Sequence, residues 1–277
     1  MRTTRLPSGD SVPVLGLGTW HMADDARRRD DELTALRLGL DLGLALVDTA
    51  EMYGDGGAET LVGEAIRGRR DDVFLVSKVL PSNAEADATM RACEGSLRRL
   101  RTDRLDLYLL HWRGPTPLEA TLDGFATLVD QGKIRHWGVS NLDHDGMVEL
   151  AGIAGGDAVT TDQVLYNVSR RAIEWDLLPW CQDRGLPLMA YSPIEQGRLL
   201  GHPALRAVAA RHDATAAQVA LAWVLRHDGV VTVPKAGTPE HVRENCGALD
   251  LQLTAEDLGE LDVAFPPPTG PHPLQML

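Results

Sequence analysis

Cysteine is scarce in this 277-residue chain, and none of its cysteines forms a recognisable pair. Cys93, Cys181 and Cys246 are odd in number, far apart in the sequence and without a Cys-x-x-Cys motif. A disulfide framework or a zinc site is therefore not expected, and the sequence suits a reducing compartment. We predict no metal site.

The chain also lacks a surplus of positive charge. It has 27 Lys and Arg against 40 Asp and Glu, which gives a formal net charge of −13. Proteins that bind nucleic acid need a basic surface to displace counterions, so the charge argues against such a partner. No apolar run reaches the roughly 18 residues of a membrane span, and the first residues lack the apolar segment of a secretory signal. These absences predict a soluble cytoplasmic protein.

Short aliphatic runs recur at about the spacing of one strand–helix unit. We predict strands at 15–18, 46–48, 73–77, 105–110, 134–139, 161–165, 187–191 and 230–233. Between them the apolar period is helical, with one helix after the acidic run 30–32 and another over 90–100. Thr215-x-x-Gln218 reads as a capping box, and Thr238-Pro239 as the start of a further helix.

Eight such units close most economically into a (β/α)₈ barrel (TIM barrel), formed by residues 1–277 as a single domain. A hairpin around Pro7–Asp10 is expected to plug the bottom, and the loops at the carboxyl ends of the strands are short. An open doubly wound sheet is the alternative, weakened by the absence of a G-x-G-x-x-G motif after any strand. The proline-rich tail 265–277 cannot be helical; it forms either an extended end or a lid over a pocket.

Four titratable residues follow three consecutive strands: Asp48, Tyr53, Lys78 and His111. Each alone has an ordinary structural explanation, but the carboxyl ends of barrel strands converge on one face. An ammonium about 4 Å from a phenol favours the phenolate by up to ~4 kcal/mol, or about three pKa units. The set therefore predicts a proton donor at Tyr53 with a lowered pKa, while His111 polarises a carbonyl. None of these groups supplies electrons, so a bound hydride donor is required.

The later strand ends offer groups suited to such a donor. Ser140, Asn141 and Gln163 combine hydrogen-bond donors and acceptors that could bind a carboxamide, and Tyr191 could stack on a flat ring. Lys235, next to the predicted helix start, is a candidate phosphate ligand of the kind barrels place after their last strands.

Eight segments match a known family in their order and spacing: VPVLGLGTW, LVDTAEMYGDGGAE, FLVSKV, LDLYLLHW, GKIRHWGVSN, TDQVLYN, MAYSP and VPKAGTPEHVREN. Through them the chain resembles the aldo-keto reductases, NAD(P)H-dependent carbonyl reductases on a (β/α)₈ barrel. The resemblance implies a catalytic tetrad of Asp48, Tyr53, Lys78 and His111, with Tyr53 as general acid. It implies cofactor binding by Thr19, Trp20, Asp48, Ser140, Asn141, Gln163, Tyr191, Ser192, Pro193, Ile194, Lys235, Ala236, Gly237, Thr238, His241, Glu244 and Asn245. The substrate pocket would be lined by Trp20, Tyr53, His111 and Trp112.

Within this family the chain is most similar to short bacterial enzymes that reduce methylglyoxal and other small 2-oxoaldehydes. It departs from the family pattern at Ala236 and His241, where many NADPH-preferring members carry Ser and Arg. Lys235, with help from Arg243, still supports a 2′-phosphate. We therefore expect NADP(H) as cofactor, with NAD(H) as a weaker alternative, a small carbonyl compound as substrate, and a monomer.

Two other functions compete with this interpretation. A barrel lyase would use Lys78 as a Schiff-base nucleophile, although a neighbouring carboxylate holds an amine protonated. A non-catalytic redox sensor would bind the nicotinamide without turnover. Arg113 could favour substrates that bear a carboxylate, or it could be an ordinary surface arginine.

Overall fold

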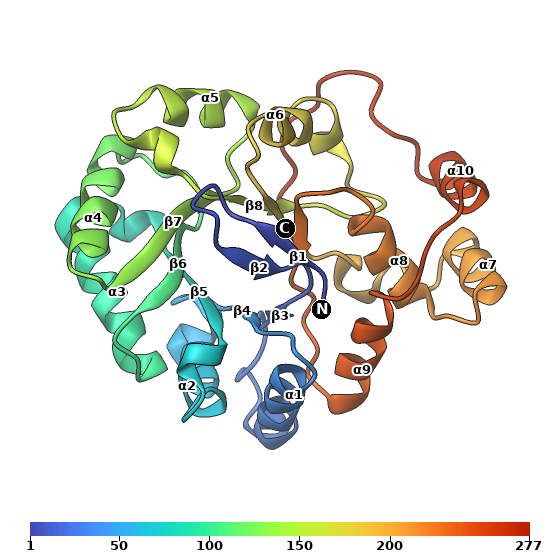
Figure 1. The fold of residues 1–277 in the computed structure, drawn as a ribbon, viewed down its shortest axis with the longest axis horizontal. Helices are drawn as coiled ribbons and strands as arrows, with labels where there is room; N and C mark the ends of the chain where they lie inside the picture. The colour runs from blue at the N-terminus through green and yellow to red at the C-terminus, as the bar shows by residue number, and fades with distance from the viewer.

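The computed structural model describes residues 1–277, and its main feature is one sheet of eight parallel strands (Figure 1). Neighbours in the sheet are also neighbours in the sequence, so each strand pairs with the next. The strands are β3 (Leu17–Gly18), β4 (Leu46–Asp48), β5 (Phe74–Val79), β6 (Leu105–Leu110), β7 (Ile134–Ser140), β8 (Asp162–Leu165), β9 (Leu188–Tyr191) and β10 (Val230–Thr232).

The first and last strands meet and close the sheet. Parallel bridges join Leu15 to Thr232 and Gly18 to Lys235. A β-carbon on Gly18 would lie only 2.3 Å from the carbonyl oxygen of Val233, so this seam needs a residue without a side chain. The barrel prediction is confirmed, and the open doubly wound sheet is wrong because its outer strands would not meet.

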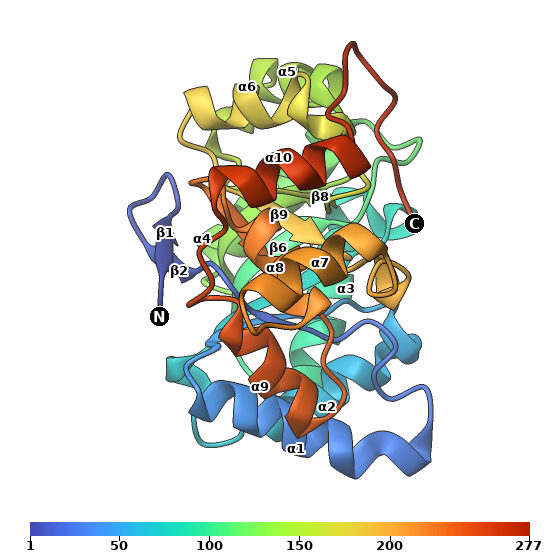
Figure 2. The ribbon, with the colours of Figure 1, turned by 90° about the vertical axis from the view of Figure 1, so that its right-hand side faces the viewer.

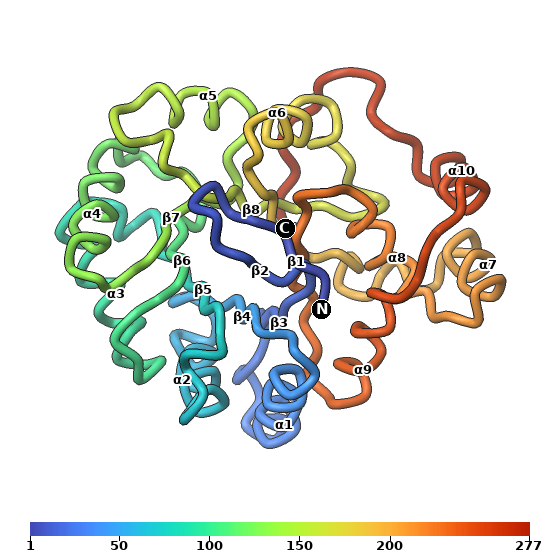
Figure 3. The backbone as a smooth tube through the Cα atoms, viewed as in Figure 1, coloured from blue at the N-terminus to red at the C-terminus, as the bar shows by residue number.

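A hairpin covers one end of the barrel, as predicted. It consists of β1 (Thr3–Arg5) and β2 (Ser11–Pro13), and it crosses the barrel axis in both the ribbon and the backbone trace (Figures 1 and 3). Leu6 and Val12 are buried against barrel-lining residues such as Leu107 and Met189. Apolar packing therefore seals this end, and the side view places the two termini at opposite ends of the molecule (Figure 2).

Helices surround the barrel and bury their apolar faces against the outer faces of the strands. They are α1 (Arg29–Asp41), α2 (Gly57–Ala65), α3 (Ala86–Leu100), α4 (Leu118–Asp130), α5 (His144–Gly152), α6 (Leu177–Asp183), α7 (Pro203–Arg211), α8 (Ala216–Val224), α9 (Pro239–Gly247) and α10 (Ala255–Ala264). No helix is both long enough and apolar enough to span a bilayer.

The predicted helix starts are confirmed by their caps. Thr215 and Gln218 exchange both capping-box hydrogen bonds at the start of α8, and Thr238 caps α9. The sequence analysis did not predict α10, although Thr254 and Asp257 form a second capping box there.

Two strands run further than predicted. β5 continues through Val79, with Lys78 paired to Leu109, and β7 continues through Ser140. The predicted strands end at Ser77 and Val139, close to the first polar side chains. The backbone hydrogen bonds between the strands continue past these residues. Lys78 and Ser140 are therefore held by strand pairing, which fixes the directions of their side chains.

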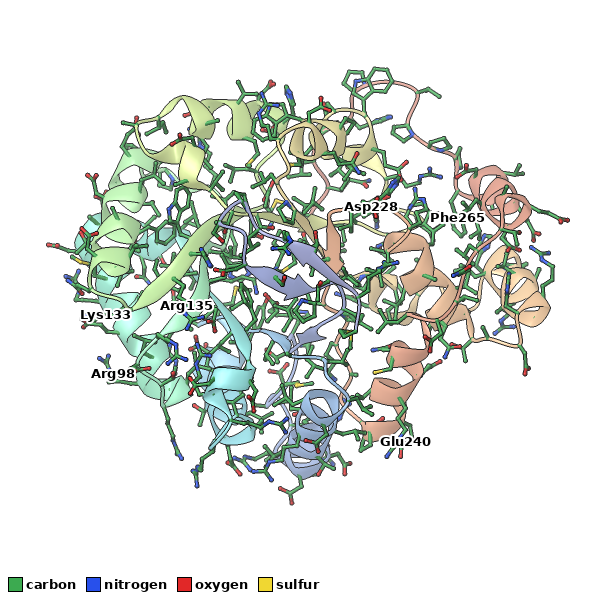
Figure 4. The ribbon with its side chains drawn as sticks, in the orientation of Figure 1. Arg98, Lys133, Arg135, Asp228, Glu240 and Phe265 are labelled. Atoms are coloured by element: carbon green, nitrogen blue, oxygen red, sulfur yellow. The ribbon has the colours of Figure 1, made fainter.

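The tail 265–277 contains no helix or strand, as predicted, yet it is packed rather than loose. The Arg171 guanidinium donates a hydrogen bond of 2.6 Å to the carbonyl oxygen of Phe265. Phe265 lies where the tail leaves α10 (Figure 4). Leu274 packs against the hydrophobic core. The backbone of Leu277 then lies beside the phenol of Tyr191, at the carboxyl end of β9, and lowers the pKa of that phenol.

Candidate active site

The ammonium of Lys78 is the centre of the predicted tetrad. Its Nζ lies 2.8 Å from the carboxylate of Asp48, 2.9 Å from the carbonyl oxygen of Thr49 and 3.0 Å from Oη of Tyr53. The side chain is fully buried. Three partners account for its three N–H groups, so Lys78 is placed to hold a charge rather than to act as a nucleophile.

Left-handed backbone in the turn after Tyr53 explains the glycines of this segment. Gly54, Asp55 and Gly56 have φ values of 55°, 51° and 85°. Glycine adopts this region without strain, and aspartate tolerates it better than most residues. The chain can thus turn sharply between the phenol and the start of α2.

Burial and charge act against each other on the tetrad. Burial raises the pKa of Tyr53 more than Lys78 lowers it, and Asp48 adds to the rise. The predicted net lowering is therefore wrong in direction, because it considered the ammonium without the burial or the carboxylate. Burial lowers the pKa of Lys78, but Asp48 and Tyr53 together raise it above its usual value. At neutral pH the phenol holds its proton and the amine is charged.

His111 completes the tetrad as a neutral ring. Burial, with a smaller contribution from the charge of Lys78, lowers the pKa of His111 to about 3. The Tyr53 ring lies 5.7 Å from His111 and 4.9 Å from Trp20, and His111 lies 4.9 Å from Trp112, measured between ring centroids. The four residues predicted to line the substrate pocket thus form one continuous aromatic wall.

A chain of hydrogen bonds joins the tetrad to the residues expected to bind a carboxamide. Tyr191 Oη donates to Asn141 Oδ1 at 3.0 Å, and Asn141 Nδ2 donates to Ser140 Oγ at 3.0 Å. Ser140 Oγ donates to the carbonyl oxygen of Gln163 at 2.7 Å, and Gln163 Nε2 donates to Asp48 at 2.8 Å. These hydrogen bonds connect side chains from β4, β7, β8 and β9 and fix their positions relative to one another.

The other predicted cofactor residues extend outward from this centre. Thr19 Oγ1 donates to the carbonyl oxygen of Asp48 at 3.0 Å, so it belongs to the same cluster. Ser192 has a left-handed backbone (φ 48°) at the start of the loop after β9 that also holds Pro193 and Ile194. Lys235, Ala236, Gly237 and Thr238 connect β10 to α9, which carries His241, Glu244 and Asn245.

A hollow of about 420 Å³ opens between α7, α8 and α9. It is lined mainly by alanines and Leu200, and Glu244 borders it. An apolar slot with a polar edge has the character of a site for a flat heterocyclic base. The residues predicted to bind the cofactor thus extend from the barrel mouth to the outer helices.

Two groups that contribute to the site are not among the predicted residues. The carbonyl oxygen of Thr49 belongs to the backbone, so its contact with Lys78 could not be predicted from the type of residue at position 49. Glu51 accepts hydrogen bonds from Leu80 N at 2.8 Å and Asn83 Nδ2 at 3.0 Å, which ties the loops after β4 and β5 together. Arg113, the other open question, pairs at the surface with Glu149.

Comparisons with known proteins agree with this geometry. Residues 14–264 match the model of the aldo/keto reductase family. Methylglyoxal reductase YeaE of Escherichia coli (strain K12) is 52% identical, over 98% of this chain and 97% of that protein. Glyoxal reductase of Bacillus subtilis (strain 168) is 33% identical, over 99% and 97%. A crystal structure of an aldo/keto reductase from Klebsiella pneumoniae with NADP and acetate has a TM-score of 0.97 and 52% identity, covering 99% of both chains. This chain belongs to the aldo/keto reductase family.

Proposed function

We propose that this enzyme reduces small aldehydes, above all 2-oxoaldehydes such as methylglyoxal, and ketones to alcohols with NADPH. The observation that carries the proposal is the contact of a buried, charged Lys78 with both Asp48 and Tyr53 beside an aromatic wall. The relatives support the substrate class, since one is named a methylglyoxal reductase and another a glyoxal reductase. The Klebsiella pneumoniae structures, with NADP or NADPH, support the cofactor.

The residues present fit a dinucleotide. Ser140, Asn141 and Gln163 would hold the carboxamide, and Tyr191 would lie against the nicotinamide ring. Lys235 and the segment before α9 would take phosphate, while the hollow beside Glu244 would take the adenine. When bound, NADPH supplies the hydride that reduces the carbonyl carbon.

The chain's own groups handle the substrate oxygen. Neutral His111 can donate a hydrogen bond to the carbonyl oxygen, which orients and polarises it. Tyr53 gives the proton of its Oη to that oxygen as negative charge develops there. Lys78, 3.0 Å from the same Oη, stabilises the resulting phenolate, and Asp48 keeps Lys78 charged and in place. A phenol with a raised pKa remains a far stronger acid than an alcohol, so the transfer is still downhill.

The pocket wall favours small carbonyl compounds. Trp20 is 36% exposed, and with Trp112 it offers apolar contact rather than directional hydrogen bonds. Apolar contacts discriminate weakly between substrates of similar size, so several small aldehydes would be accepted.

The substitution Tyr53→Phe tests the proposal. It removes the proton donor, and we expect kcat for methylglyoxal with NADPH to fall by about 10²-fold or more while the Kd of NADPH changes little. Tyr108→Phe is the matched control, because Tyr108 is also fully buried but its hydroxyl has no partner. Full turnover in Tyr53→Phe would refute the proton-donor role. NADPH binding by the wild type without consumption of any aldehyde would favour the redox-sensor alternative.

A further inference from the structure

Three consecutive arginines, Arg27–Arg29, lie at the start of α1, and only the middle one lacks a carboxylate partner. Arg27 pairs with Asp25 at 2.8 Å, and Arg29 pairs with Glu64 at 2.5 Å. The guanidinium of Arg28 makes no hydrogen bond or ion pair within the chain. The guanidinium of Arg28 is therefore available to bind an anionic ligand.

Arg28 points toward another unpaired cation. A β-carbon on Gly237 would lie 2.8 Å from Lys235 Nζ and 3.1 Å from an Arg28 guanidinium nitrogen. The two groups come from opposite ends of the barrel sequence and meet because α1 and α9 lie side by side (Figures 1 and 2). The charge of Arg28 acts, after burial, to lower the pKa of Lys235, as two close cations require.

No carboxylate of the surroundings forms an ion pair with these two cations. Asp24 pairs with His21 at 2.7 Å, and Glu32 accepts the backbone N–H of Ala23 at 2.9 Å. Glu240, in the first turn of α9, is exposed and interacts with groups of its own helix (Figure 4). Two converging cations without an anion repel each other, so an anionic ligand between them would relieve a cost already present in the fold.

Gly237 leaves the space for that ligand. A side chain there would contact both cationic groups, whereas glycine keeps the region between them open. Lys235 is followed by Ala236 and Gly237, neither of which carries a charge. Arg28 supplies the second positive charge beside Lys235.

We propose that Arg28 is a specificity-determining residue that binds, together with Lys235, the 2′-phosphate of NADPH. This inference rests on the proposed function for the identity of the cofactor. A phosphate held by two cations from separate elements is bound by charge-assisted hydrogen bonds, which are stronger than neutral ones. Arg28 therefore favours NADPH, which carries the 2′-phosphate, over NADH, which lacks it.

The test compares Arg28→Ala with Arg27→Ala, its paired neighbour, by titrating NADPH, NADH and 2′,5′-ADP against the intrinsic tryptophan fluorescence at low salt. We expect Arg28→Ala to weaken NADPH and 2′,5′-ADP about tenfold or more and NADH less than about twofold. Arg27→Ala should change none of the three, and Arg28→Lys should recover part of the loss. Without ligand, the melting temperature of Arg28→Ala should not fall, because the substitution removes a repulsion.

Other outcomes separate this inference from the proposed function. Equal weakening of NADPH and NADH in Arg28→Ala would place Arg28 on a phosphate that both cofactors share, and would overturn the proposal. Unchanged binding of all three ligands would overturn it as well. A wild type that binds NADPH through Arg28 but reduces no aldehyde would refute the proposed function and leave the inference standing.

Discussion

His111 and Tyr53 face the same pocket, and burial keeps both uncharged by shifting their pKa values in opposite directions. The imidazole has a pKa lowered to about 3, while that of the phenol is raised. Burial always disfavours the charged form, which is the acid form of histidine and the base form of tyrosine. At neutral pH the pocket thus presents two neutral hydrogen-bond donors over one buried cation.

The shift of His111 links stability to pH. An unfolded histidine takes up a proton below about pH 6.5, whereas folded His111 does so only near pH 3. Folding stability is therefore lost as the pH falls from 6.5 toward 3, and His111 accounts for about 2 kcal/mol between pH 7 and pH 5. Urea unfolding of wild type and His111→Gln at both pH values measures this share. An equal loss in the two proteins would show that His111 titrates normally.

At the scale of elements, the tail 265–277 joins the outer helices to the barrel mouth. Arg171 holds its start, Leu274 packs against the core, and Leu277 reaches Tyr191. Burial raises the pKa of Tyr191 to about 12. The tail thus ends beside a residue that is predicted to contact the nicotinamide.

Removal of residues 274–277 should raise the pKa of Tyr191 further. The backbone of Leu277 lowers this pKa against the effect of burial, so its loss should move the titration of one tyrosine to higher pH in an absorbance titration. Leu274→Ala is the control, since it removes packing but keeps the backbone at Tyr191. An unchanged titration curve after truncation would mean that the tail does not act on this phenol.

The eight strands, and the approach of three of the tetrad residues to one another, were predictable from the sequence for one physical reason. Parallel strands bring their carboxyl ends to one face, so Asp48, Lys78 and His111 had to meet once the strands were located. The net direction of the Tyr53 pKa was not predictable, since it depends on burial and on a second charge. Arg28 also escaped notice, because three adjacent arginines look alike until their partners are known.

At the scale of the whole molecule, the barrel depends on the seam between its first and last strands. Gly18 lies there against the backbone of Val233 and pairs with Lys235. A side chain at this position must push the two edges apart, because the atom that it meets belongs to the backbone. The same seam therefore supports both barrel closure and the position of Lys235, the proposed phosphate ligand.

Gly18→Ala should lower the free energy of unfolding by on the order of 3 kcal/mol and weaken NADPH binding. Gly259→Ala is the matched control: it lies in α10 with open space around it, so the same change should stabilise the protein by about 0.5–1 kcal/mol. Urea denaturation of the two variants gives both values. A Gly18→Ala protein as stable as the wild type would show that the seam can relax.

The hairpin at the floor of the barrel has a practical consequence. Because β1 and β2 cap the end away from the carboxyl end of β9, a fusion partner or a solid support attached ahead of Met1 faces away from the proposed entrance for substrate and cofactor. An attachment after Leu277 would instead crowd that entrance. Immobilised enzyme coupled through its amino end should therefore keep its turnover, whereas enzyme coupled through the opposite end should lose it.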